Sequence, residues 1–98
     1  MPGVARVGDT HGGICHGNPV VGTIVEGSPN VITNGRRTAR LNDGVVHNCP
    51  VCGTGNISSS SRTVLANGIG VARLGDSVAY PGGGGIITSA SGDTFAGG

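Results

Sequence analysis

The chain has 98 residues, a formal net charge of +1 and 36% hydrophobic residues, with one Tyr, one Phe and no Trp. This length fits one small domain with a thin core, and its weak charge and few aromatic residues exclude a typical nucleic-acid-binding surface. No run of about 18 apolar residues predicts a membrane span, and the N-terminal sequence has no signal-peptide pattern. We therefore expect synthesis in a cytoplasm.

The phrase Ala-Arg-x-x-Asp occurs three times in the chain, beginning at Ala5, Ala39 and Ala72. The offsets between them are 34 and 33 residues, and a nearly constant period in this range indicates one supersecondary unit that is used three times. We expect the Asp of each phrase to close a strand through a bond from its side chain to the backbone. For the Arg side chains, an exposed strand face or an Arg–Asp pair is favoured over contact with a partner.

Glycine makes up 21 of the residues, and no window holds a long amphipathic helical pattern, so the sequence predicts an all-β fold. In chain order we expect a strand over 20–25, an Asn34-Gly35 hairpin turn, a matching Asn67-Gly68 turn, a flexible loop over 82–85 and a short strand over 86–88. The first unit lacks an upstream hairpin, and the missing strand is expected to come from elsewhere in the chain.

All His and Cys residues follow the first two phrases. Aligning His11 with His47 places His16 over Cys52, so that both loops read His, four residues, then His or Cys. Because closed structural zinc sites take four such ligands, we predict a tetrahedral site of His11, His16, His47 and Cys52. In the third unit, at an offset of 33 residues, Tyr80 replaces His47 and Gly85 replaces Cys52, so that loop has lost its ligands.

The identity of the sulfur ligand stays open at this point. Cys49 is the alternative to Cys52, because the segment Cys49–Cys52 forms a Cys-x-x-Cys pair that can bind zinc by itself. Cys15 lies beside His16, and a reducing cytosol favours metal ligation over disulfides. A redox role is disfavoured because no helix follows the pair. The remaining interpretation is buried thiols and hydrogen-bonded imidazoles.

Several of these motifs together resemble the PAAR-repeat family. The resemblance rests on the three repeated phrases, on His11-Gly12-Gly13, on residues 26–31 and on Asn34-Gly35, and it covers essentially the whole chain. It implies a small all-β cone of three pseudo-threefold repeats of short strands and hairpins. At its apex it implies a Zn²⁺ ion, or alternatively iron, bound by three His and one Cys. The His47–Pro50 segment resembles some members and favours Cys49.

The resemblance implies a structural protein without enzymatic activity. It would cap and sharpen a trimeric β-helical spike of a contractile injection machine, one tip per trimer, and contact the target membrane transiently as it pierces it. Its location would be a phage tail baseplate tip in the virion or a type VI secretion spike, after synthesis in the bacterial cytoplasm. We expect one PAAR-repeat domain over 1–98 without an effector extension.

Other functions remain as alternatives. One is a type VI secretion tip or adaptor that carries effectors, and another is a small zinc enzyme. The enzyme is disfavoured because Glu26 is the only Glu and no His-Glu-x-x-His motif occurs. Neither nucleic acid nor a small-molecule substrate is expected. Core packing is favoured over a docking surface for most of four apolar strand residues, namely Val31, Ile32, Val64 and Leu65.

Overall fold

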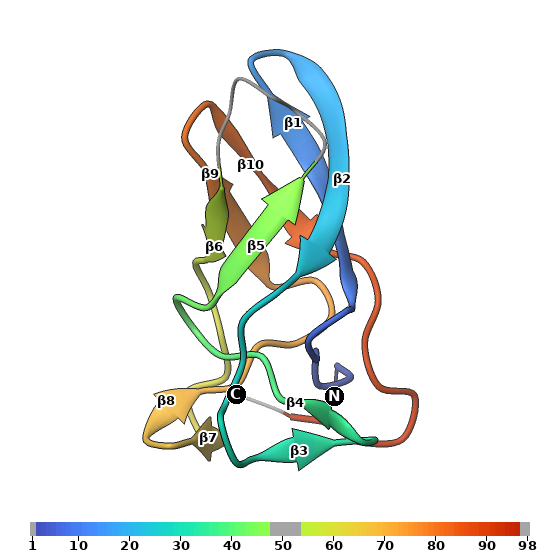
Figure 1. Ribbon diagram of the computed structural model, residues 1–98, viewed down its shortest axis with the longest axis vertical. Coiled ribbons are helices and arrows are strands. Elements are labelled where there is room, and N and C mark those ends of the chain that lie inside the picture. The colour runs from blue at the N-terminus through green and yellow to red at the C-terminus, as the bar shows by residue number, and fades with distance from the viewer. Residues whose placement is uncertain (1, 48–53, 97–98) are drawn as a thin grey trace.

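A computed structural model describes residues 2–47 and 54–96 of the chain. Within these residues the secondary structure consists of strands, without a helix, which confirms the all-β prediction. The molecule measures 33 × 23 × 22 Å and narrows from a broad base to an apex (Figure 1). No helix in the described residues has the length and apolar character needed to cross a membrane.

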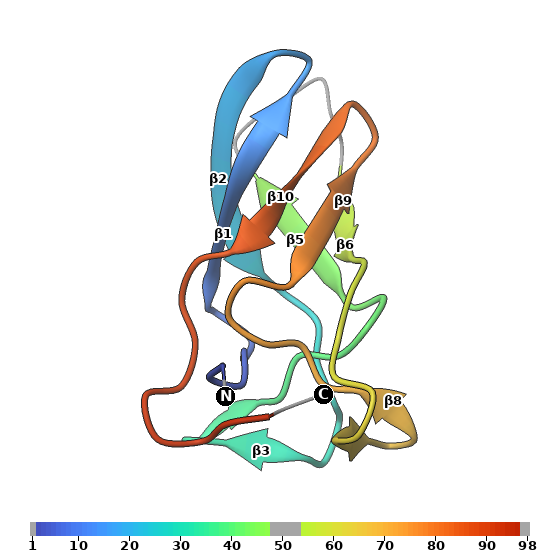
Figure 2. The ribbon, with the colours of Figure 1, turned by 180° about the vertical axis from the view of Figure 1, so that it is seen from behind.

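Six strands form a closed antiparallel barrel toward the apex (Figures 1 and 2). Two short hairpins lie at the base, outside this barrel. The barrel order is β1 (Thr10–Cys15), β10 (Gly83–Ile87), β9 (Ser77–Tyr80), β6 (Gly55–Ile57), β5 (Gly44–His47) and β2 (Asn18–Ile24). The base hairpins are β3 (Ile32–Thr33) with β4 (Arg36–Arg37), and β7 (Leu65–Ala66) with β8 (Ile69–Gly70).

The alanines of the three repeated phrases meet in the interior. Ala5 N donates to Ala72 O at 2.9 Å, Ala72 N to Ala39 O at 2.9 Å, and Ala39 N to Ala5 O at 3.0 Å. These three backbone hydrogen bonds form a closed ring, and all three alanines are fully buried. A larger side chain at any of them would have to displace packed backbone, which explains why the phrase begins with Ala.

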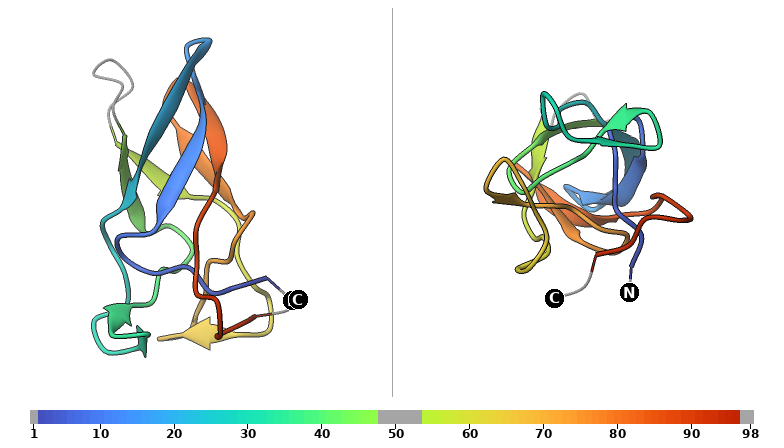
Figure 3. Two further views of the ribbon diagram at one scale, coloured as in Figure 1. Left: turned by 90° about the vertical axis from the view of Figure 1, so that its right-hand side faces the viewer. Right: turned by 90° about the horizontal axis from the view of Figure 1, so that it is seen from below.

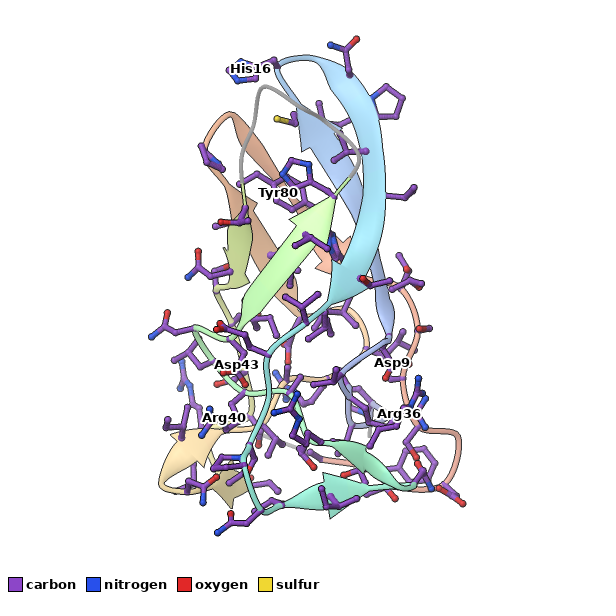
Figure 4. The ribbon with its side chains drawn as sticks, in the orientation of Figure 1. Asp9, His16, Arg36, Arg40, Asp43 and Tyr80 are labelled. Carbon is purple, nitrogen blue, oxygen red and sulfur yellow. The ribbon has the colours of Figure 1, made fainter. Side chains whose placement is uncertain are left out.

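The Arg and Asp of each phrase form an ion pair that closes a tight turn. In each phrase the Arg backbone N–H donates to Asp Oδ2 at 2.7–2.8 Å, while Nε and Nη2 bind the two carboxylate oxygens at 2.9–3.1 Å. The three pairs are Arg6–Asp9, Arg40–Asp43 and Arg73–Asp76, and we call them the Arg–Asp girdle. Figure 4 labels Arg40 and Asp43 of one pair and Asp9 of another. The girdle confirms both the backbone bond of the Asp and the favoured Arg–Asp pairing.

Both Asn-Gly turns have the predicted two-residue geometry. The φ values are +53° and +77° at Asn34 and Gly35, and +55° and +76° at Asn67 and Gly68. The flanking residues pair directly across each turn, which identifies two-residue type I′ hairpins. Each turn Asn then reaches the neighbouring corner of the base: Asn34 Nδ2 donates to Asp93, and Asn67 Nδ2 donates to Asn30.

The third corner of the base is assembled from both ends of the described chain. Val4 N donates to Thr94 O at 2.8 Å, and Ala96 N donates to Pro2 O at 3.0 Å. These bonds reproduce the pairing within the other two corners, where Val71 N, for example, donates to Val64 O at 3.0 Å. Residues 94–96 therefore take the place of the strand missing from the first unit. This confirms the expectation that the strand comes from elsewhere in the chain.

The glycine run after residue 81 differs from the prediction of a flexible loop, because Gly83–Ile87 forms strand β10. This strand pairs closely with β1. A Cβ atom at Gly83 would lie 2.0 Å from Ile14 O, and one at Gly85 would lie 2.2 Å from Gly12 O. Glycine at these positions therefore permits close approach of two backbones rather than mobility.

The core beneath the barrel repeats with the chain. Ile24, Ile57 and Ile87 are almost fully buried, and each exchanges backbone hydrogen bonds with the residues of the preceding girdle turn. Ile24 N, for example, donates to Asp9 O at 2.9 Å, and Ile87 N makes the same bond to Asp76 O. Each repeat thus ties one girdle turn to one core isoleucine.

Asp9 of the girdle makes the stability of the fold depend on pH. Burial alone would raise the pKa of Asp9, but hydrogen bonds from Arg6 and Ser89 outweigh it and lower that pKa below its ordinary value. Because the folded pKa lies below the unfolded one, this stabilisation is complete above about pH 4 and is lost as the pH falls through the folded pKa. Asp9→Asn should cost about 3 kcal/mol at pH 7. Thermal unfolding should show the difference from the parent narrowing below about pH 4.

Arg62→Gln, at an exposed charge outside the girdle, is the matched control and should follow the parent at each pH. A parent-like melting temperature for Asp9→Asn at pH 7 would contradict this role of the girdle.

Candidate functional site

His11 lies buried inside the barrel near the apex, with both ring nitrogens hydrogen-bonded. Its Nε2 lies 2.8 Å from Val46 O, and its Nδ1 lies 2.5 Å from the Tyr80 hydroxyl. A carbonyl oxygen can only accept, so Nε2 carries the proton and Nδ1 accepts from Tyr80. Burial lowers the pKa of His11, against the raising effect of the Val46 hydrogen bond, which favours this neutral form.

His47 and Tyr80 complete a cluster of three rings. The Tyr80 ring centroid lies 5.4 Å from that of His11 and 4.8 Å from that of His47. Tyr80 is only 6% exposed, and burial raises the pKa of its hydroxyl. The Nε2 atom of His47 is buried as well. β1, β5 and β9 therefore supply one ring each to a shared interior position.

The structure supports the predicted equivalence of His47 and Tyr80, since both end strands that begin directly after a girdle Asp. It corrects the alignment of His11 with His47. Counted from the girdle, His11 corresponds to Val45 and Val78, which are buried at the same level, and Gly13 corresponds to His47. The sequence alignment was wrong by two residues. Counting from the Asp of each phrase in the sequence reveals the shift, because His11 follows Asp9 by two residues and His47 follows Asp43 by four. A shift of two keeps a side chain on the same face of a strand, so both histidines still face the interior.

His16 lies at the apex, apart from the ring cluster (Figure 4). With Gly17 it forms the β1–β2 turn, where φ values of +50° and +79° indicate type I′ geometry. Its ring lies against Gly82, whose Cβ, if present, would be 2.3 Å from His16 Nε2. Five residues of extended strand separate its Cα from that of His11 by about 16 Å. The described arrangement therefore does not bring His16 together with His11 and His47.

The cysteines are divided between described and undescribed parts of the chain. Cys15 is fully buried, faces the barrel interior and is disulfide-bonded. This differs from the expectation that the cysteines avoid disulfides, although Cys15 was not among the predicted ligands. The predicted sulfur ligand Cys52 and its alternative Cys49 lie outside the described residues.

The described donors fit a metal only in part. His11 and His47 supply two imidazoles at one position, and imidazole nitrogen suits zinc or iron. Among residues 2–47 and 54–96, no group of three or more His, Cys, Asp or Glu side chains converges as a metal site. A complete site would therefore need a donor from the segment 48–53 or a movement of His16.

A second feature lies at the base, where three apolar side chains are exposed at equivalent positions. Ile32 is 53% exposed, Leu65 is 56% exposed and Phe95 is 50% exposed. Val31 and Val64, which precede two of them, are 37% and 38% exposed. The core assignment favoured for these valines, Ile32 and Leu65 was therefore wrong. In two-residue strands at the rim, one side of the hairpin faces solvent.

Phe95 was missed by the sequence analysis because its strand is completed by the other end of the chain. A repeated serine marks the three corners and could have revealed it. The Oγ atoms of Ser28, Ser61 and Ser91 each accept a hydrogen bond from the backbone N–H three residues later, at 2.9–3.0 Å. Counting four residues on from each serine gives Ile32, Leu65 and Phe95. Seen from below, the base has three lobes around the barrel (Figure 3).

A cleft of about 290 Å³ opens on the side of the molecule next to Glu26, Asn42 and Asn56. Glu26 Oε1 accepts a hydrogen bond from Gly44 N at 2.7 Å, so its carboxylate supports the end of the Arg40–Asp43 turn, where β5 begins. Among the residues lining this cleft, Glu26 is the single ionisable side chain. A lone exposed carboxylate does not provide the acid–base pair that hydrolysis requires.

The family model described as PAAR motif matches residues 2–53 and, in a second overlapping match, residues 16–83. Two staggered matches are what a repeated unit produces, and together they cover most of the chain. A comparison with curated proteins gave no match. The closed β-cone, the threefold girdle and these matches agree, and the chain belongs to the PAAR family, a structural family of spike tips in contractile injection systems.

Proposed function

We propose that this protein caps the blunt end of a trimeric β-helical spike, in a contractile phage tail or a type VI secretion system. One observation carries the proposal: Ile32, Leu65 and Phe95 repeat around the base, and each is about half exposed. Exposed apolar side chains that recur at equivalent places mark an interaction surface rather than chance exposure.

The symmetry of the base selects the kind of partner. A single chain with three similar corners can present three similar contacts to a true trimer at once, which gives one tip per three spike chains. A monomeric partner would use only one corner and leave two apolar side chains in water. The trimer is thus the partner that covers all three positions.

We further propose that a metal ion, Zn²⁺ or alternatively iron, fastens the apex. The proposed ligands remain His11, His16, His47 and Cys52, with Cys49 as the alternative sulfur. His11 and His47 support the proposal because both rings pack against the same side chain, Tyr80. Val46 O orients the His11 ring through Nε2, which leaves Nδ1 as the atom that can turn toward a metal in place of Tyr80. When bound, such an ion would cross-link the apical loops.

The role proposed here is mechanical rather than enzymatic. The family is structural, and the side cleft contains a single carboxylate that already supports a turn. A piercing tip must keep its shape under load. The ring of backbone hydrogen bonds between the three alanines, the Arg–Asp girdle and the closed barrel provide that rigidity. We propose that the tip pierces the target membrane while it is mounted on the spike of a virion or of a secretion system.

The docking proposal predicts the effect of a charge at the base. Leu65→Glu should weaken binding to the purified spike trimer at least about thirtyfold, because it places a carboxylate in an apolar contact. Isothermal titration should give one parent tip per spike trimer. Val21→Glu, an equally exposed substitution near the apex, is the matched control and should bind like the parent. A three-to-three complex, or equal loss in both variants, would refute the docking surface.

The metal proposal predicts about one zinc or iron ion per chain by elemental analysis. Chelation should lower the melting temperature, and His47→Ala should remove the metal and the same increment of stability. Asn18→Ala, beside the apical turn but without a metal-binding side chain, is the control. His16→Ala tests whether His16 belongs to the ligand set. If this variant loses the metal, His16 is a ligand, and the apical turn must bend toward His47 when the ion binds. A metal-free parent that melts at the same temperature with and without chelator would exclude the ion.

A further inference from the structure

The charged residues of this chain lie at one end of the molecule. All six Arg and all five acidic residues fall in the girdle or nearer the base, and the segments 10–25, 44–61 and 77–92 contain none. These three segments supply every strand of the barrel. Figure 4 shows Asp9, Arg36, Arg40 and Asp43 in the lower half of the molecule and His16 at the apex. The apical half is therefore free of Asp, Glu, Lys and Arg.

Two rows of exposed apolar side chains cross the outer face of β2, β1 and β10. The register places Pro19 beside Ile14, and Val21 and Ile86 on either side of Gly12. Val21 is 64% exposed, and Ile14 and Ile86 are each 50% exposed. We call these four side chains, Ile14, Pro19, Val21 and Ile86, the apical flank. It is a continuous apolar surface on strands, well away from the docking base.

The polarity of this outer face changes in steps toward the base. Directly below the apical flank lies a row of three threonines, in which Thr10 pairs with Thr23 and hydrogen-bonds Thr88 through their hydroxyls at 2.8 Å. The next residue along β1 toward the base is Asp9, which binds Arg6 and Arg36. Apolar, hydroxyl and ionic groups thus follow one another over five residues, or about 16 Å of strand.

The backbone of this region is also suited to a dry environment. Each barrel strand is hydrogen-bonded to a neighbour on both sides over at least part of its length, and β1 pairs with β2 over Thr10–Cys15 and with β10 over residues 11–15. Most loops and sheet edges are costly to transfer out of water because their exposed N–H and C=O groups have no hydrogen-bond partner in the protein. At the centre of the outer face, along β1, neither charge nor unpaired backbone therefore opposes transfer into an apolar phase.

We propose that the apical flank is a lipid-contact surface, which seats the apical half in one leaflet of a phospholipid bilayer. The threonine row then lies at the interface and the Arg–Asp girdle lies at the headgroups, where it limits the depth of entry. The hydrocarbon of one leaflet is about 15 Å thick, and Ile14 lies about 13 Å of extended strand beyond Thr10, so the apical flank fits within that thickness. The inference rests on the proposed spike-tip role in one respect only, namely that the apex is the end of the molecule that meets the membrane first.

The distribution of charge favours lipid over a protein partner. A protein interface generally has an apolar centre and a polar rim that surrounds it. Here the charged residues form a level at one end, and the neutral surface continues around the apex through Val46 and Ala79 on the opposite strands. A medium that surrounds the apex on all sides, such as acyl chains, fits this arrangement better than a partner on one face.

The absence of Trp from the chain permits a direct test. Val21→Trp and Leu65→Trp each introduce one Trp, the first on the apical flank and the second on the docking base. Both proteins are mixed with phosphatidylcholine vesicles, with and without bromine on the acyl chains. We expect a blue shift for Val21→Trp and at least about twofold quenching by the brominated lipid, since indole fluorescence follows burial among acyl chains. The Leu65→Trp signal should not change.

Charge substitutions complete the test. Val21→Glu and Ile86→Glu should reduce flotation of the protein with vesicles at least tenfold, while Leu65→Glu should float like the parent. Equal quenching of both Trp variants, parent-like flotation of Val21→Glu, or failure of the parent to float would each overturn the inference. Self-association that Val21→Glu abolishes, in a protein that does not float, would assign the flank to a second copy. None of these readouts involves the spike, so a failure here and a failure of docking are separate results.

Discussion

The ring of backbone hydrogen bonds that joins Ala5, Ala39 and Ala72 is the constraint on which the other features depend. It fixes three distant segments around one axis, and the small side chain lets the backbones approach closely. Once these segments are fixed, each following Arg and Asp must leave the axis in the same direction. The girdle turns, the core isoleucines and the base corners then repeat because they start from equivalent places.

The girdle divides the molecule into two chemical environments. Its carboxylates are nearly buried and each is held by its own Arg, so the charges are neutralised where the cone changes width. Below it, side chains such as Asn34 and Asn67 connect neighbouring corners through polar contacts. Above it, strand pairing and apolar packing replace ionic contacts. The same element therefore stabilises the fold and marks the boundary between a polar base and a neutral apex.

The local features of the fold were predictable from the sequence, and the distant ones were not. The Asn-Gly turns and the Asp caps are properties of short segments, so the residue types alone indicated them. The places of Phe95 and of strand β10 depend on partners far along the chain. Phe95 is positioned by pairing with Pro2 and Gly3, and β10 by pairing with β1. The cluster of His11, His47 and Tyr80 was predicted only in part. The alignment matched residue types rather than the distance from the repeated Asp, and the packing of Tyr80 against both imidazoles depends on how distant strands close the barrel.

The symmetry of the repeats is kept at the base and lost near the apex for a geometric reason. Three equivalent side chains at the base point away from the axis and stay separate, so each corner can hold a similar residue. Inside the narrow barrel, equivalent positions converge, and Gly13, His47 and Tyr80 cannot all be large. Two rings with centroids 4.8 Å apart fill that level, and a Cβ on Gly13 would meet Gly84 O at 2.2 Å. Divergence of the apical loops is thus a consequence of closing a threefold structure to a point.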